Sequence, residues 1–142
     1  MAIRDNRAIF LVDTSAAVAL AVADHEHHDT TFDALAGRRL GLSGHAAFET
    51  FSVLTRLPAP ARRTPSTVAR LLATNFPHSR FLGTRAAAAV LAGLQTGDIA
   101  GGAVYDALVG ATAAEHDLVL VTRDRRALAT YRQLDVDVEL LA

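Results

Sequence analysis

The sequence predicts an α/β fold of three layers, in which a mostly parallel central sheet lies between helices. Helix-like and strand-like segments alternate along the chain, which is the pattern of parallel strands joined by crossover helices. The two most apolar strand candidates, Ile9–Val12 and 118–121, show no polar alternation, as is typical of strands buried on both faces. No repeat or linker interrupts the chain, so we expect a single domain over residues 1–142.

The first half of the chain carries clear helix start and stop residues. Thr64 followed by Pro65 is a typical helix start, and Pro58 ends the helix before it. The run Asp29-Thr30-Thr31 offers side chains that can cap a helix ending at Gly37. After the first strand we expect helices over 16–23, 29–37, 45–57 and 65–75, and a short strand over 39–42.

The second half is expected to complete the alternation. Thr84 can cap an alanine-rich helix, and the helix over 103–115 is apolar nearly all round, so we expect it to be buried. Residues 136–141 alternate and predict an edge strand. The expected elements are a short strand over 80–82, helices over 84–95 and 103–115, a strand over 118–121, a short helix over 125–132 and the edge strand.

Composition excludes several classes of protein. The chain has no cysteine, which rules out disulfides and thiolate metal sites. No stretch reaches the roughly 20 apolar residues of a membrane helix, and the polar start does not resemble a secretory signal, so we expect a cytoplasmic protein. All 14 cationic residues are arginine, yet the net charge of −1 does not suit a protein that simply coats polyanions.

Acidic side chains follow both apolar strands. Asp13 comes directly after Val12, and Asp124 follows Val121 through Thr122-Arg123. The carboxyl ends of parallel strands meet at one edge of the sheet, where ligands bind. Each aspartate alone could equally be a helix cap, so the pairing is the informative observation.

Asp106 and Glu49 are two further carboxylates that lie among apolar residues in the sequence. Asp106 lies in an apolar helix, where an unpaired carboxylate is costly unless an arginine or a metal ion compensates it. Glu49 lies between Phe48 and Phe51, although a solvated helix face remains an open alternative. Four carboxylates without cysteine or a clear histidine set favour Mg²⁺ or Mn²⁺, and such a site suits phosphoryl transfer.

The remaining motifs carry less information. The run His25-Glu26-His27-His28 lacks the spacing of a zinc helix and predicts a solvated loop, and we assign no role to His45. With no tryptophan and two tyrosines, the sequence shows no aromatic stacking platform. Arginines at 123, 125 and 126 flank Asp124; they could contact the phosphates of a ligand, but for most of them we expect a solvated face or pairing with nearby acids.

Taken together, these segments resemble the PIN-domain family, and within it the VapC toxins of bacterial toxin–antitoxin pairs. The resemblance covers essentially the whole chain and rests on the order and spacing of four segments. They are Val12-Asp13-Thr14-Ser15-Ala16, Glu49, Tyr105-Asp106-Ala107-Leu108 and Val121-Thr122-Arg123-Asp124.

The resemblance implies the toxin of a type II toxin–antitoxin system, an Mg²⁺- or Mn²⁺-dependent endoribonuclease in which metal-activated water attacks an RNA phosphodiester. It implies an RNA substrate, a VapB-type antitoxin that occupies the active-site groove, and a homodimer. By position, the acidic metal-binding and catalytic residues would be Asp13, Glu49, Asp106 and Asp124, with Ser15 and Thr122 in support.

Two alternatives stay open at this stage. One is a PIN fold that binds RNA or a protein without cleavage, and the other is a small phosphohydrolase with Asp13 as nucleophile. Asp13-Thr14-Ser15 lacks the second aspartate of haloacid-dehalogenase-type phosphatases, which disfavours the latter.

Overall fold

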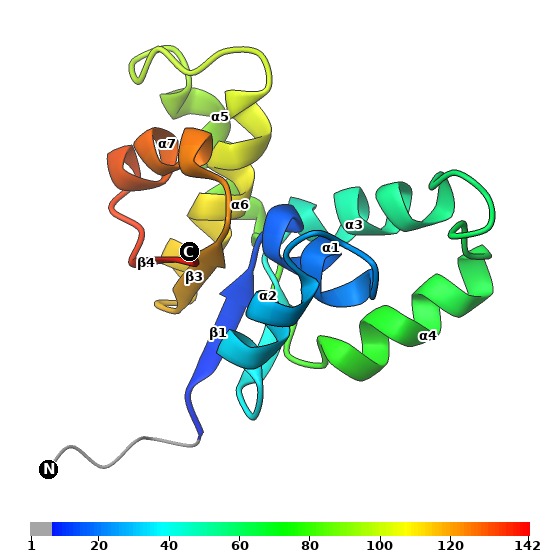
Figure 1. Ribbon diagram of the computed structural model, residues 1–142. Coiled ribbons are helices and arrows are strands. Elements are labelled where there is room, and N and C mark those ends of the chain that lie inside the picture. The colour runs from blue at the N-terminus through cyan, green and yellow to red at the C-terminus, as the bar shows by residue number, and fades with distance from the viewer. Residues whose placement is uncertain (1–6) are drawn as a thin grey trace, which may run out of the picture.

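Four parallel strands form one sheet in the order β2-β1-β3-β4 in the computed structural model, which describes residues 7–142 (Figure 1). The strands are β1 (Ile9–Val12), β2 (Arg39–Leu42), β3 (Val119–Thr122) and β4 (Val138–Leu140). The polar residues 1–6, which bear on the expected lack of a secretory signal, lie outside the described residues. No helix of the described chain is long and apolar enough to span a membrane.

Helices connect the strands and cover the sheet. They are α1 (Thr14–Ala21), α2 (His28–Leu35), α3 (His45–Thr55), α4 (Pro65–Asn75), α5 (Thr84–Gly93), α6 (Ala103–Glu115) and α7 (Leu128–Gln133), with a short 3₁₀ turn η1 (Arg125–Ala127) before α7. In Figure 1, α1 to α4 lie on one side of the strands and α5 to α7 on the other. The predicted three-layer α/β/α fold with a parallel sheet is confirmed.

Residues of one strand point alternately to two separate cores. Leu11 and Leu120 pack with Val109 and Tyr131, on the side of α6 and α7. Their neighbours Val12 and Val121 pack with residues of α1 and α2 on the opposite face. This explains the uninterrupted apolar runs in the sequence, because β1 and β3 are buried on both faces.

The strand register brings the ends of β1 and β3 together. Val12 pairs with Val121 on one side and with Leu42 on the other. The chain leaves β1 toward β2, whereas β3 lies on the other side of β1, so strand order reverses between β1 and β3. Ligands bind at the carboxyl edge at such a switch point, which is where Asp13 and Asp124 lie.

Three local predictions were wrong. Thr84 does not cap the alanine-rich helix, because it is the first residue of α5 and Gly83, which has no side chain to donate or accept, holds the capping position. The expected strand over 80–82 does not form, because Arg80 alone makes an isolated bridge, to Ser43, and Phe81 is exposed. The helix expected to be capped by the run 29–31 begins at His28, and its capping position, His27, makes no side-chain cap. Residue propensities indicated these features, but strand pairing and helix packing determined whether and where each element forms.

Candidate active site

Asp13 is held by hydrogen bonds to both of its carboxylate oxygens. It caps α1 and is 4% exposed. Oδ1 accepts from the Ser15 hydroxyl at 2.6 Å and from the Ala16 backbone N–H at 3.1 Å. Oδ2 accepts from the hydroxyls of Thr122 and Tyr131, the latter at 3.0 Å. Burial raises the pKa of the Asp13 carboxyl, and these four hydrogen bonds oppose that rise.

The two supporting hydroxyls link the ends of β1 and β3. The Ser15 hydroxyl accepts from the Arg123 backbone N–H at 2.8 Å, and the Thr122 hydroxyl accepts from the Asp124 N–H at 2.9 Å. Asp124 in turn caps η1, since its Oδ1 accepts from the Arg126 N–H at 3.0 Å. Each strand-end aspartate is therefore a helix cap and also part of the acidic group.

Asp106 lies in the first turn of α6 and is partly exposed. This corrects the expectation of a fully buried helix: the buried residues of α6 begin at Ala107, and Tyr105 is 50% exposed. Among the described residues its carboxylate has no hydrogen-bond or ion-pair partner. Desolvation raises the pKa of Asp106, and the charges of Asp124, Glu49 and Asp13 raise it further.

Glu49 faces the other acids from α3. Its Oε2 accepts from the Thr14 hydroxyl at 3.0 Å, and its Oε1 lies 3.2 Å from Nε2 of His45 one helical turn earlier. Glu49 therefore lines the edge of the cavity while its side chain remains 37% exposed, so a solvated helix face and a place at the cavity hold together. Gly44, at a φ of 53°, starts α3 where a side chain would collide with Thr112.

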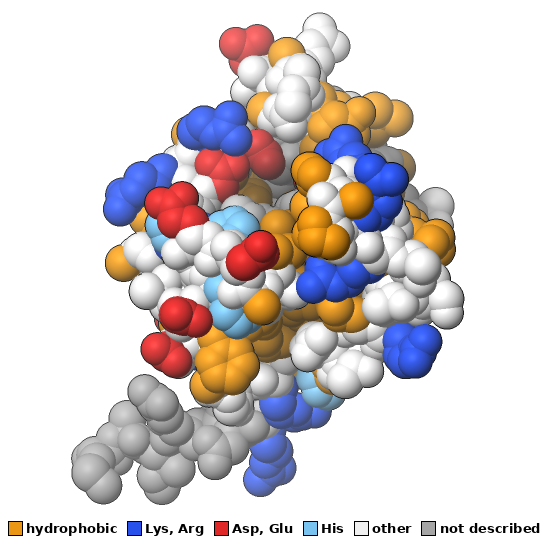
Figure 2. All heavy atoms as spheres, turned by 45° about the vertical axis from the view of Figure 1, so that its right-hand side comes forward, with side chains coloured by type: hydrophobic (Ala, Val, Ile, Leu, Met, Phe, Trp, Pro, Cys, Tyr) orange, Lys and Arg blue, Asp and Glu red, His pale blue; other side chains and the backbone are white. Residues whose placement is uncertain are grey.

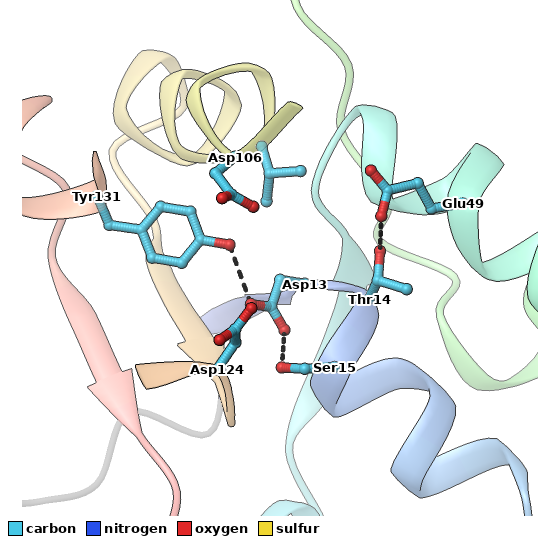
Figure 3. A pocket seen from close by; sticks show the side chains of 8 residues that line it. Asp13, Thr14, Ser15, Glu49, Asp106, Asp124 and Tyr131 are labelled. Atoms are coloured by element: carbon cyan, nitrogen blue, oxygen red, sulfur yellow. Dashed lines mark hydrogen bonds between the residues drawn. The ribbon is translucent and has the colours of Figure 1, made fainter. Parts of the chain in front are cut away.

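The four predicted acids surround a small cavity of about 60 Å³ (Figure 3). It is lined by Asp13, Thr14, Ser15, Glu49, Asp106, Val109, Asp124 and Tyr131. In the described residues no three Asp, Glu or His side chains form a ready-made metal-binding group. The donors are nonetheless all oxygen, and their mutual repulsion would be relieved by a hard divalent cation.

Three residues of the site were missed by sequence reasoning. Tyr131 is separated from Asp13 by 118 positions, Thr14 binds Glu49 across 35 positions, and His45 stands beside the same glutamate. For Tyr131 and Thr14 no local pattern marks these partners. The His45–Glu49 spacing of four on a helix was a usable signal.

Exposed aromatic side chains gather beside Glu49. The sequence did not predict this cluster of rings. The rings of His45 and Tyr105 stack at 4.8 Å, and Phe48 meets Phe81 edge-on at 6.1 Å. Phe48 is 65% and Phe81 is 52% exposed. A set of solvent-facing rings therefore exists although the chain lacks tryptophan.

The chain matches the PIN-domain family model over residues 10–133. Ribonuclease VapC27 of Mycobacterium tuberculosis is 45% identical over 131 residues, which is 92% of this chain and 96% of that protein. Ribonuclease VapC40 of the same species is also 45% identical over 131 residues, or 91% and 96% of the two chains.

Solved structures show the same fold at lower identity. VapC20 of Mycobacterium tuberculosis, a toxin that cleaves the sarcin–ricin loop, superposes with a TM-score of 0.67 at 22% identity, covering 84% of this chain and 93% of its own. DNA-bound VapBC of Salmonella typhimurium gives 0.64 at 22%, covering 93% and 97%. The sequence match over most of the chain and the shared fold together place this protein in the PIN-domain family.

Proposed function

We propose that this protein is the toxin of a type II toxin–antitoxin pair and cleaves RNA phosphodiester bonds with the help of Mg²⁺ or Mn²⁺. The observation that carries the proposal is the convergence of Asp13, Glu49, Asp106 and Asp124 on one cavity at the sheet edge. Relatives named ribonucleases at 45% identity support the reaction class.

The four acids fit a divalent cation by their chemistry. When bound, such a cation lowers the pKa of a coordinated water and stabilises negative charge on a phosphoryl group. Asp106 is the readiest ligand, because among the described residues nothing donates to its carboxylate. Asp13 is the most rigid of the four, and Ser15 and Thr122 fix its orientation. Glu49 is held for the same cavity by Thr14.

The contacts of Asp13 disfavour the alternative in which it is a nucleophile. A carboxylate has about four lone-pair directions, and Asp13 already accepts four hydrogen bonds. Attack on a phosphorus atom would require one oxygen to give up a donor and to move out of this set into bonding distance of the phosphorus. A cation would also displace one donor from the oxygen that it binds, but the other three would still orient the carboxylate.

The partners belong to the same proposal. We infer an RNA substrate, a VapB-type antitoxin and a homodimer; the solved relatives include VapBC complexes from Salmonella typhimurium and Rickettsia felis. Light scattering on the purified chain checks the dimer: twice the 15.0 kDa mass of one chain is expected, and a mass of 15.0 kDa at all concentrations would refute it.

Cleavage of total RNA by purified protein tests the function. Wild-type protein should cut RNA with Mg²⁺ or Mn²⁺, lose activity in EDTA and regain it when metal is restored. Asp13→Asn and Asp106→Asn should each lower the rate by at least about 100-fold while keeping the far-UV circular dichroism spectrum. Unchanged turnover in either variant would overturn the assignment, and binding without cleavage by wild-type protein would favour a non-cleaving module.

A further inference from the structure

A second, larger groove opens beside the acidic cavity. It has a volume of about 430 Å³ and is lined by Thr14, Ser15, Val18, His25, His27, Val53, Arg123, Asp124 and Arg126. Thr14, Ser15 and Asp124 also line the acidic cavity, so the two hollows are adjacent. The larger one has the size of a small-molecule or nucleotide site, whereas the acidic cavity has room for little more than an ion and its waters.

The charge of the groove differs from that of its neighbour. Arg123 and Arg126 line it with two histidines, against the single carboxylate of Asp124. Arg126 forms an ion pair with Asp124, with its Nε 3.4 Å from Oδ1. Arg123 forms no ion pair with any described carboxylate. The groove therefore carries cationic side chains next to the acidic cavity. This arrangement suits an anionic strand whose reacting phosphate lies over the acids.

Arg123 is held in position before any ligand arrives. Its backbone N–H donates to Ser15 at 2.8 Å, and its Nη1 donates to the buried hydroxyl of Thr31 at 3.2 Å. The guanidinium keeps its other N–H donors for a ligand. Because the side chain is already ordered, binding a phosphate through it loses little conformational entropy.

The loop between α1 and α2 supplies another part of the groove wall. The rings of His25 and His27 lie 5.9 Å apart, and Nδ1 of His25 accepts the His27 backbone N–H at 3.0 Å. In the neutral ring this leaves the proton on Nε2, so His25 presents a hydrogen-bond donor. The expected solvated histidine loop is therefore in part a groove wall (Figure 2, where pale-blue histidines lie beside a hollow in this face).

We propose that this groove binds a nucleotide next to the scissile phosphate of a single-stranded RNA, with Arg123 on a backbone phosphate and His25 and His27 against the nucleotide. The proposal rests on the ribonuclease function proposed above and adds where the strand lies. Arg123 and the two histidines are positioning residues in it, since none of them lines the acidic cavity.

Equilibrium binding in an Asp13→Asn background tests the groove without cleavage. The probe is a fluorescein-labelled single-stranded RNA of roughly eight nucleotides, read by anisotropy. Adding Arg123→Ala should weaken binding by about 10-fold or more and reduce the slope of log K against log salt by about 0.7, the loss of one phosphate contact. Arg123→Lys should restore much of that slope, and His25→Ala should weaken binding about 3-fold or more.

Arg125→Ala is the matched control, because Arg125 is an exposed neighbour that does not line the groove. It should leave affinity within about 2-fold. Equal affinity and salt slope for the Arg123 and Arg125 variants would overturn the proposal. So would a result in which Arg123→Ala spares RNA binding and abolishes inhibition by the antitoxin, because the groove would then be a protein site.

The design separates this proposal from the ribonuclease function. If wild-type protein fails to cleave RNA but RNA binding depends on Arg123, the ribonuclease function is refuted and the proposed groove site is supported. If cleavage occurs and Arg123→Ala changes neither the KM nor the binding constant, the groove fails and the function stands. Thermal melting of each variant verifies that it is folded.

Discussion

The Asp13 carboxylate accepts four hydrogen bonds, and Tyr131 provides the most remote of them along the chain. Tyr131 is 1% exposed, and burial together with the charge of Asp13 raises its pKa, so its hydroxyl stays protonated and donates. This residue connects the α6–α7 core to the acidic cavity. It is the clearest case in which packing and the candidate chemistry use the same side chain.

Tyr131→Phe should weaken both stability and cleavage. Removing a buried hydrogen bond to a charged group costs about 1.5–3 kcal/mol in the free energy of unfolding. We expect kcat to fall roughly 10-fold with little change in KM, because Asp13 loses orientation while the groove is untouched.

Tyr105→Phe is the control for this substitution, since that tyrosine is half-exposed and its hydroxyl has no hydrogen-bond partner among the described residues. Tyr105→Phe should change the free energy of unfolding by less than about 0.5 kcal/mol. Urea denaturation and steady-state cleavage measure both variants. Equal losses in the two would show that the Tyr131 hydroxyl does not position Asp13.

Asp106 should make the stability of the metal-free protein depend on pH, in a direction that its raised pKa fixes. The pKa of Asp106 in the folded protein lies above the ordinary aspartate value of 3.8, so between these two pKa values the folded state retains a proton that the unfolded state has lost. The free energy of unfolding of metal-free protein therefore falls as pH rises from about 3.8 through the raised pKa. Asp106→Asn should flatten this fall and stabilise the metal-free protein at neutral pH.

Thermal melting in EDTA between pH 4 and pH 8 measures the effect. Asp33→Asn, on the exposed side of α2, makes the same change of charge outside the acidic group. If both asparagine variants followed the wild-type pH profile, the repulsion inferred at Asp106 would be absent.

At the scale of elements, β2 depends on a close backbone approach. A side chain at Gly41 would collide with the backbone carbonyl of His78, and Gly41 also bridges to Pro77. This strand leads through Ser43 into α3, which carries Glu49. The packing of one glycine against a loop thus helps to place an acid of the site.

Gly41→Ala should destabilise the protein by about 1–3 kcal/mol, since the loop must shift to admit a methyl group. Gly93→Ala is the matched control, because nothing lies within 4 Å of its added carbon at the end of α5. There the same substitution should be neutral or stabilise by up to about 1 kcal/mol. Urea midpoints compare the two; similar losses would contradict the close contact at Gly41.

Elements were predictable where one local signal dominates. Thr64 accepts from the Thr67 N–H and Pro65 opens α4, as the sequence predicted. Prediction failed at 80–82 because a short segment with two apolar residues forms a strand only if the sheet offers a partner. It also failed for the first turn of α6, since apolar side chains there extend past the part of the helix that packs on the sheet.

For the whole molecule, a divalent cation should act as a stabilising ligand. Binding to the folded state alone adds about 2.7 kcal/mol at a metal concentration of 100 times Kd. We expect Mg²⁺ or Mn²⁺ to raise the Tm of wild-type protein and to raise that of Asp106→Asn much less. Differential scanning calorimetry measures both, with NaCl matching the ionic strength, and equal gains would contradict metal binding by Asp106.

The sequence by itself determined the layered fold, the two buried strands and the presence of Asp13 and Asp124 at their ends. These features follow from periodicity and from the geometry of parallel sheets, which act over a few residues. The tertiary structure alone decided that Tyr131 and Thr14 hold the acids, that Asp106 is partly exposed, and that Arg123 lines a groove. Those properties depend on contacts between segments up to 118 positions apart and on packed surfaces, for which no local pattern exists.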